Sequence, residues 1–178
     1  MKRPAGVVSF HRQSLILDPL QQQIVELLPR LRRLARVLAR QPADADDLVQ
    51  LTVERALAAR GQWRPGTQLD SWIFRIMKNA WIDETRARKR RSAVLAPEEA
   101  GENVGDAGAR TVEARLEAAE VERAIARLPE EQRLAVALVL VDGLSYKEAA
   151  EVLEVPQGTL TSRLVRGRQA LLAQLEGA

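Results

Sequence analysis

Apolar residues recur three or four positions apart along much of the chain, which is the spacing of one face of an α-helix. Residues 20–40 carry Ile24, Leu28 and Leu31 in this register and predict a first helix. Pro29 lies inside this segment, and we expect it to bend or divide the helix because proline removes a backbone donor. No segment of the sequence shows the period-two alternation of a β-strand, so the pattern favours an all-α protein.

Two further helices are predicted in the first half of the chain. Pro42 interrupts the first pattern, and Asp44 is the expected N-cap of a helix that continues to about Ala59. The loop sequence GQWRPG separates this helix from a longer one in residues 68–91, which ends in the basic run RARKRR. Residues 14–92 are therefore expected to form one small helical domain.

The composition changes in residues 93–112, where glycine and proline accompany acidic residues. This composition is typical of a flexible linker. Helical spacing resumes afterwards, so residues 113–178 are expected to form a second small helical domain. The predicted architecture is all-α, with two small helical domains joined by a flexible acidic linker and a helix-turn-helix in the second domain.

The helix-turn-helix is predicted from residues 144–172. Ser145 and Glu148 form an S-x-x-E capping box at the start of one helix, and Pro156 stops that helix and opens the next. The second helix carries Thr, Ser and Arg on its outer face, and residues 157–174 contain no acid, which suits an approach to DNA phosphates. Arginine can pair with guanine, and serine or threonine with bases or phosphates. The pattern predicts a DNA-binding helix; the alternative is an ordinary surface helix of a small helical protein.

Two further polar surfaces are candidates for function. Trp63 in the loop, Arg75 and Asn79 on the third helix, and the basic run together suit single-stranded DNA. The alternative is that the aromatic residues of this helix form core and that the basic run is solvated. On the second helix, Asp47 and Glu54 belong to a polar stripe that either binds a basic protein surface or is simply solvated.

Composition narrows the possible chemistry. The chain has 178 residues, a net charge of +3 and no Cys, and its single His is His11 near the N-terminus. These counts exclude a disulfide framework and a thiolate metal site. We expect no catalytic residue, metal or cofactor, because the sequence offers no identifiable carboxylate pair, phosphate-binding glycine loop or nucleophile. No apolar run reaches the ~18 residues of a membrane span, and no signal peptide is apparent, so we expect a cytoplasmic protein without membrane insertion.

Three segments together resemble one family, the extracytoplasmic-function group of the bacterial sigma-70 factors. Residues 44–57, DADDLVQLTVERAL, are similar to the segment that binds core RNA polymerase. Residues 67–90 resemble the segment that recognises the promoter −10 element, and residues 128–171 resemble the domain that recognises the −35 element. The resemblance covers about residues 20–175 with its motifs in the expected order, and it implies a promoter-directing sigma factor rather than an enzyme.

The resemblance also implies roles for individual residues. Polymerase binding would involve Asp47, Leu48, Gln50 and Glu54. Recognition of the −10 element, with one base flipped from the non-template strand, would involve Gln62, Trp63, Arg64, Arg75, Asn79 and Arg86. Recognition of the −35 element would involve Thr159, Thr161, Ser162, Arg163 and Arg166. Thr161 stands where the family often has a basic residue, and the loop GQWRPG is particular to this chain, so both promoter sequences stay open.

The partners that the resemblance implies are core RNA polymerase, promoter DNA and an anti-sigma factor, and the free chain is expected to be a monomer. A stand-alone helix-turn-helix regulator is the alternative function. Such a regulator accounts only for the last third of the sequence, and it would bind paired half-sites as a symmetric dimer without polymerase.

Overall fold

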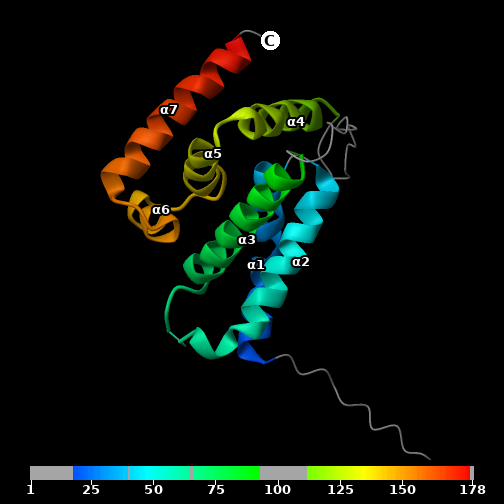
Figure 1. The fold of residues 1–178 in the computed structure, drawn as a ribbon, viewed down its shortest axis with the longest axis vertical. Helices are drawn as coiled ribbons and strands as arrows, with labels where there is room; N and C mark the ends of the chain where they lie inside the picture. Colours follow the sequence, from blue (N-terminus) through cyan, green and yellow to red (C-terminus); the bar gives the residue numbers. More distant parts are fainter. Residues whose placement is uncertain (1–17, 40, 65, 93–111, 177–178) are drawn as a thin grey trace, which may run out of the picture.

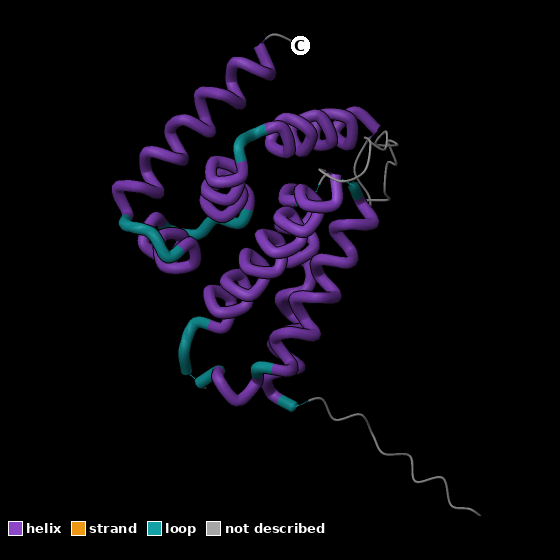
Figure 2. Tube along the Cα trace, in the orientation of Figure 1, coloured by secondary structure: helices purple, strands orange, loops and turns teal. Residues whose placement is uncertain are grey.

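The computed structural model of the protein describes residues 18–39, 41–64, 66–92 and 112–176. Within these residues the chain forms seven α-helices, a short 3-10 helix and one π-helix, and no strand (Figure 2). The all-α prediction is therefore confirmed. The predicted linker lies outside the described residues except for Val112.

The N-terminal half is a bundle of three helices, α1 (Pro19–Leu38), α2 (Pro42–Ala58) and α3 (Leu69–Ser92) (Figure 1). A 3-10 helix, Arg60–Gln62, lies between α2 and α3. The apolar faces of the helices enclose Leu31, Phe74 and Met77, whose side chains are almost completely buried. The three predicted helical segments are present, and their apolar faces form the core of this half.

Two local predictions in this half are corrected by the structure. α2 begins at Pro42 and its N-cap is Gln41, so Asp44 is not the N-cap and lies in the first turn. Proline at the first helical position already has a helical φ, which explains the earlier start. Asp44 instead makes an ion pair with Arg88 of α3 at 2.8 Å. Pro29 does not divide α1, which is continuous across it.

The C-terminal half contains α4 (Val112–Arg127), α5 (Glu130–Val136), a π-helix (Ala137–Val141), α6 (Tyr146–Leu153) and α7 (Gln157–Glu176). The predicted capping box of α6 is confirmed. The backbone N–H of Glu148 donates to the Ser145 hydroxyl at 3.2 Å, and the N–H of Ser145 donates to the Glu148 carboxylate at 2.9 Å. After α6, Glu154 adopts a left-handed backbone with φ 58°, and Pro156 precedes α7. Helices α6 and α7 form the predicted helix-turn-helix.

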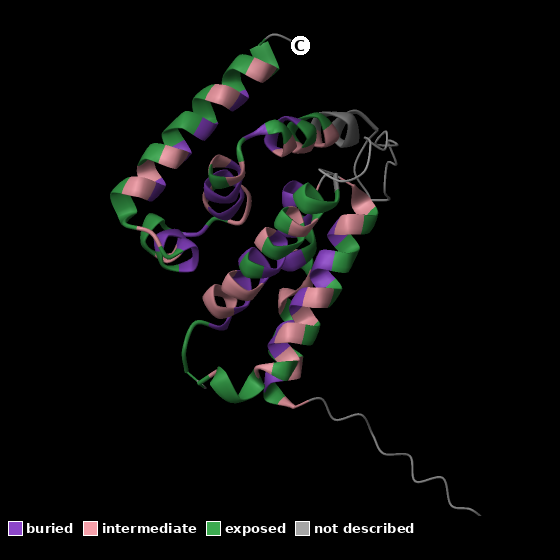
Figure 3. Ribbon diagram, viewed as in Figure 1, coloured by how far each residue is buried: buried purple, intermediate pink, exposed green. Residues whose placement is uncertain are grey.

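The two halves are in direct contact. α3 packs against α6, and α1 packs against α4, α5 and the π-helix. Buried positions appear on α3, α5 and α6 where these helices approach one another (Figure 3). The buried hydrophobic residues of both halves form a single cluster. The structure is therefore a closed arrangement in which α3, the predicted −10 helix, lies next to the helix-turn-helix.

Candidate nucleic-acid interface

The outer face of α7 holds the residues predicted to recognise the −35 element. On the inner face Leu160 is completely buried and fixes the helix against the rest of the C-terminal half. The exposed Ser162 donates its hydroxyl to the carbonyl of Thr159, and Thr161 donates to that of Gln157, each at 2.9 Å. Each hydroxyl hydrogen is engaged by the helix itself, so each hydroxyl oxygen is left as an acceptor.

The two arginines of this face have different surroundings. Arg166 is exposed, and its Nε donates to the carbonyl oxygen of Ser162 at 3.2 Å. The side chain of Arg163 is only 18% exposed and makes an ion pair with Glu131 of α5 at 3.0 Å. Thr159 is half-buried near the start of α7. The structure therefore places Ser162 and Arg166 on the accessible surface, whereas Arg163 also holds α7 against α5.

The loop before α3 combines exposed and packed side chains. Gln62 and Arg64 are exposed, whereas Trp63 is half-buried and packs against the hydrophobic core. On α3 itself, Phe74 is 1% exposed and Trp81 is 6% exposed, so the interpretation of these aromatic residues as core is confirmed. Trp72, at the start of α3, is half-buried and packs against the core as Trp63 does, so both side chains are partly accessible at this end of α3.

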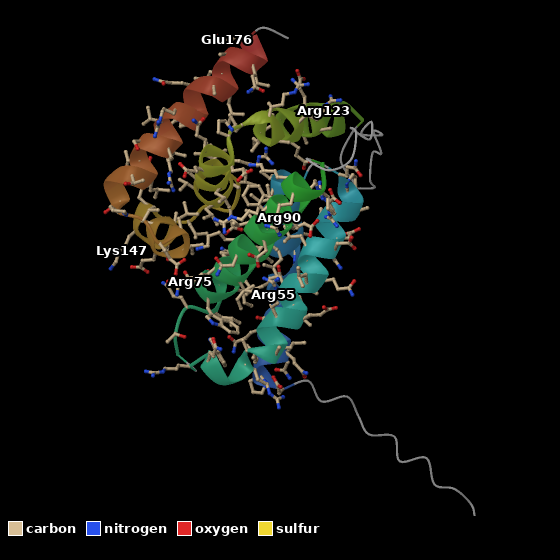
Figure 4. The ribbon with its side chains drawn as sticks, in the orientation of Figure 1. Arg55, Arg75, Arg90, Arg123, Lys147 and Glu176 are labelled. Atoms are coloured by element: carbon tan, nitrogen blue, oxygen red, sulfur yellow. The ribbon has the colours of Figure 1, made fainter. Side chains whose placement is uncertain are left out.

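One face of α3 carries Arg75, Asn79 and Arg86, as predicted from their spacing. Asn79 and Arg86 are exposed, and Arg75 is half-buried. Arg75 lies where α3 approaches α6 (Figure 4), and its Nη2 donates to the carbonyl oxygen of Glu151 at 3.5 Å. The predicted −10 residues thus share one face, but the helix-turn-helix already occupies part of it.

Two lysines also lie on this face: Lys89 belongs to the predicted basic run, whereas Lys78 was not predicted. Lys78 is 6% exposed, and its Nζ lies 2.5 Å from the carboxylate of Glu154 after α6. The hydrogen bond and charge of Lys78 lower the pKa of Glu154 below its usual value. Lys89 pairs with Glu130 of α5. The signal that could have identified both lysines is their i, i+3 spacing from predicted arginines.

The polar stripe of α2 is accessible along its length. Asp47, Gln50 and Glu54 are exposed, and the Gln50 side-chain amide donates to the Glu54 carboxylate at 3.0 Å. Leu48 does not belong to this surface, because it is 5% exposed and packs in the core. Its side chain supports α2 from inside, beneath the exposed stripe.

In the described part of the chain, the Asp and Glu side chains form no group of three or more that could hold a metal ion. None of its helices is long and apolar enough to cross a membrane. The accessible polar groups of α3 and α7 include cations, amides and hydroxyls, which are the groups that proteins use to bind nucleic acid. On α3 the carboxylates of Asp83 and Glu84 are also exposed, and they pair with arginines.

Two protein-family models match the chain, one in each half. The model of Sigma-70 region 2 matches residues 24–91, and the model of Sigma-70 region 4 matches residues 118–171. The ECF RNA polymerase sigma factor EcfG of Rhodopseudomonas palustris is 35% identical over 166 residues, which cover 90% of this chain and 87% of EcfG. The chain belongs to the extracytoplasmic-function (ECF) group of the sigma-70 family. Below, α1–α3 are called the region 2 half and α4–α7 the region 4 half.

Further relatives agree with this assignment. The ECF RNA polymerase sigma factor SigM of Mycobacterium tuberculosis is 40% identical over 148 residues, covering 83% of this chain and 72% of SigM. The sigma factor RpoE of Bartonella quintana, solved in complex with the anti-sigma factor NepR, has a TM-score of 0.74 at 28% identity, covering 90% of this chain and 98% of that one. CnrH, solved with the cytosolic domain of CnrY, has a TM-score of 0.66 at 27% identity, covering 89% and 88%.

As an ECF sigma factor the chain directs transcription initiation from promoters. Sigma factors are regulatory proteins without a catalytic role. The stand-alone regulator is not favoured, because it leaves the match to Sigma-70 region 2 unexplained.

Proposed function

We propose that this sigma factor binds core RNA polymerase through α2 and recognises the −10 and −35 promoter elements through α3 and α7. The proposal rests on how the exposed polar surfaces are distributed between the two halves. The exposed acidic stripe and the α3 polar face belong to the region 2 half, whereas Ser162 and Arg166 belong to the region 4 half. Each half can therefore contact its own DNA element.

In the region 4 half, α7 enters the major groove with its outer face. Arg166 pairs with a guanine or a phosphate, and Thr161 and Ser162 supply hydroxyl oxygens. Arg163 joins them once its guanidinium leaves Glu131, while Thr159 lies at the edge of the contact. One bidentate arginine–guanine contact contributes about 1–3 kcal/mol of discrimination, so Arg166 dominates the proposed −35 recognition.

In the region 2 half, the −10 element lies along α3 and its preceding loop. Asn79 and Arg86 contact the strand from α3, and Arg75 joins them when the helix-turn-helix moves away. The loop residues Gln62, Trp63 and Arg64 surround a base flipped from the non-template strand. Unstacking that base costs a few kcal/mol, on the order found in other flipped-base systems, and the polymerase-bound complex must offset it.

Core RNA polymerase is the proposed partner of the acidic stripe formed by Asp47, Gln50 and Glu54. Each DNA contact alone is small and salt-sensitive. Attachment of both halves to polymerase makes the second DNA contact effectively intramolecular, which raises its local concentration. The free chain is proposed to be a monomer of the cytoplasm, where polymerase and promoters are found.

An anti-sigma factor is a further proposed partner. RpoE and CnrH, whose folds this chain shares, were each solved with an inhibitor bound, NepR and the cytosolic domain of CnrY. An inhibitor of this class would cover the polymerase-binding stripe or hold the two halves together. Co-purification from cells under inducing and non-inducing conditions tests this: recovery of polymerase alone in every condition argues against it.

The experiment that tests the proposed function is transcription in vitro. The purified chain is mixed with core polymerase and a library of genomic promoter fragments, and the transcripts are sequenced. Promoter-specific initiation is expected, and the transcripts define both elements. Initiation identical with and without the chain would refute the proposal.

Single substitutions then separate the three surfaces. Arg166→Ala should lower transcription from −35-dependent promoters about 10- to 100-fold while leaving polymerase binding intact. Arg168→Ala is the control, since Arg168 is exposed on another side of α7. Asp47→Lys should weaken polymerase binding, whereas Glu26→Lys, at an exposed acidic residue of α1, should not. Loss of polymerase binding in Arg166→Ala would mean that the roles are wrongly assigned.

A further inference from the structure

Each half contributes a charged side chain that is buried where the two halves meet. Lys78 of the region 2 half is 6% exposed and bonds to Glu154 of the region 4 half at 2.5 Å. The side chain of Asp142, from the region 4 half, is 1% exposed and bonds to Arg30 of α1 at 2.6 Å. A buried charge is strongly unfavourable unless it is paired. One buried charge comes from each half, and each is paired with a residue of the other half. This arrangement favours a specific docking of the two halves over an incidental contact.

The Asp142 contact is oriented on both sides. The π-helix ends with the N–H of Asp142 donating to the carbonyl of Ala137 at 3.0 Å, which directs the carboxylate toward α1. Arg30 donates two hydrogen bonds to the Asp142 carboxylate, from Nε at 3.2 Å and from Nη2 at 2.6 Å. Arg30 is held in place by Asp70 at 3.1 Å and by the ring of Phe74, whose centroid lies 5.1 Å from its guanidinium. Both partners are therefore positioned within their own halves.

The second contact falls on the surface proposed for DNA. The left-handed turn at Glu154 brings its carboxylate over α3, where it meets Lys78. On either side, Arg75 donates to the backbone carbonyl of Glu151, and Lys89 pairs with Glu130. Acidic and carbonyl oxygens of the region 4 half thus follow the cations of α3, much as the phosphates of a DNA strand would.

We propose that the free sigma factor is self-masked: its helix-turn-helix docks on the DNA-binding face of α3, and Lys78 is a further phosphate-binding residue that becomes available only when the halves separate. The proposal rests on the proposed role of α3 in −10 recognition. Carboxylate and phosphate oxygens are alternative partners for one ammonium group. Glu154 and a DNA phosphate therefore compete for Lys78, and any ligand that binds only the open form shifts the population toward it.

The docked form can be detected as a distance, without polymerase. The chain has no Cys, so Thr67→Cys before α3 and Lys147→Cys on α6, both exposed, accept a pair of spin labels or fluorophores. Their neighbours Gln68 and Glu148 form a hydrogen bond of 3.2 Å between the halves. One short, narrow distance distribution is expected for the free chain, because the paired charges and the shared hydrophobic cluster hold the halves together. A broad distribution would overturn the proposal.

Charge reversal tests the named pair directly. Glu154→Lys and Lys78→Glu should each lengthen the distance, and the double reversal should restore the short one. Glu176→Lys, at the exposed end of α7 (Figure 4), is the matched control and should leave the distance unchanged. Circular dichroism checks that each variant remains helical. A short distance in both helical single variants would show that this pair does not hold the halves together.

Binding to DNA tests the role of Lys78. Glu154→Gln should bind a labelled single-stranded oligonucleotide of mixed sequence about tenfold more tightly than the unaltered chain, as expected when a masked form loses a tenfold preference. Lys78→Gln added to Glu154→Gln should abolish that gain. Equal binding by all three chains would overturn the proposal. Because these measurements omit polymerase, absent promoter transcription with an intact short distance would count against the proposed function alone.

Discussion

The two halves contribute different kinds of side chain to the shared hydrophobic cluster. All three Trp of the chain lie in the region 2 half, whereas the single Tyr, Tyr146, is 39% exposed in the region 4 half. The region 4 half instead brings helices close together: a Cβ at Gly167 of α7 would lie 2.8 Å from Cγ2 of Val136 on α5. The region 2 half fills its interior with large aromatic side chains, whereas in the region 4 half α5 and α7 lie close together. We therefore expect removal of a large side chain to destabilise mainly the region 2 half, and addition of a methyl group at the α5–α7 contact to destabilise the region 4 half.

Removal of a large buried side chain should cause the greatest loss of stability, and the loss should be larger in the region 2 half. Phe74 is 1% exposed, so Phe74→Ala should destabilise that half by about 3–5 kcal/mol through lost burial and a cavity. Leu160→Ala, at a completely buried position of the region 4 half, should cost about 2–5 kcal/mol. Hydrogen exchange followed along the chain measures both effects.

The exchange pattern also tests whether the halves are separable. We expect each variant to lose protection mainly in the half that carries the substitution. Equal loss across both halves in both variants would show that the single hydrophobic cluster makes the two halves one cooperative unit.

Addition of a single methyl group should act on the region 4 half. Gly167→Ala gains up to about 1 kcal/mol of helix propensity but forces Cβ against the stiff, buried Val136, and overpacking costs about 1–3 kcal/mol. A net loss of stability is expected, measured by urea unfolding. Gly158→Ala is the control, because a Cβ there has no atom within 4 Å. A Gly167→Ala chain as stable as Gly158→Ala would mean that α5 and α7 can move apart freely.

Each half also has a helix that begins with a side-chain N-cap, and loss of such a cap should have a smaller effect on stability. Ser145 caps α6, and Asp18 caps α1 together with Gln21. Replacement of either cap by Ala should cost about 1 kcal/mol. Ser145→Ala should lower protection around α6 and Asp18→Ala around α1, measured by the same hydrogen exchange. A loss much larger for Ser145 would indicate that α6 depends on its cap more than on packing.

Much of the local structure could be predicted from the sequence. Helical spacing identified the helices, and the S-x-x-E pattern identified the α6 cap, because both signals lie within one or two turns of chain. The start of α2 was misplaced because two competing signals, Pro42 and Asp44, lie two residues apart. The burial of Leu48 was already suggested by the apolar pattern around it, but the resemblance placed it on the binding surface.

The contacts between the halves could not be predicted in the same way. Arg30 and Asp142 are 112 positions apart in sequence, and Lys78 and Glu154 are 76 apart. Periodicity describes which face of one helix is apolar and says nothing about which helix will cover it. Lys78 looks in sequence like any surface lysine, and only the approach of Glu154 shows it as a buried cation with an acidic partner.

The smallest expected effect is a pH dependence of the contact between the halves, and it tests how much Glu154 contributes to that contact. Lys78, and more weakly Arg75, both on α3, lower the pKa of Glu154 in the closed form below its ordinary value of 4.5. A lowered pKa means that the ionised carboxylate favours closure. This contribution is complete above about pH 4.5 and is lost as the pH falls through the lower pKa of the closed form.

The distance between labels on Thr67→Cys and Lys147→Cys should therefore stay short near neutral pH and lengthen in acid. Since the Glu154 side chain is 59% exposed, solvent screens the pair and the change should be modest. Glu154→Gln removes the titrating group, so acid should lengthen its distance less. Identical pH profiles for the two chains would show that Glu154 carries none of the closure, leaving Asp142 and the apolar contacts to hold the halves together.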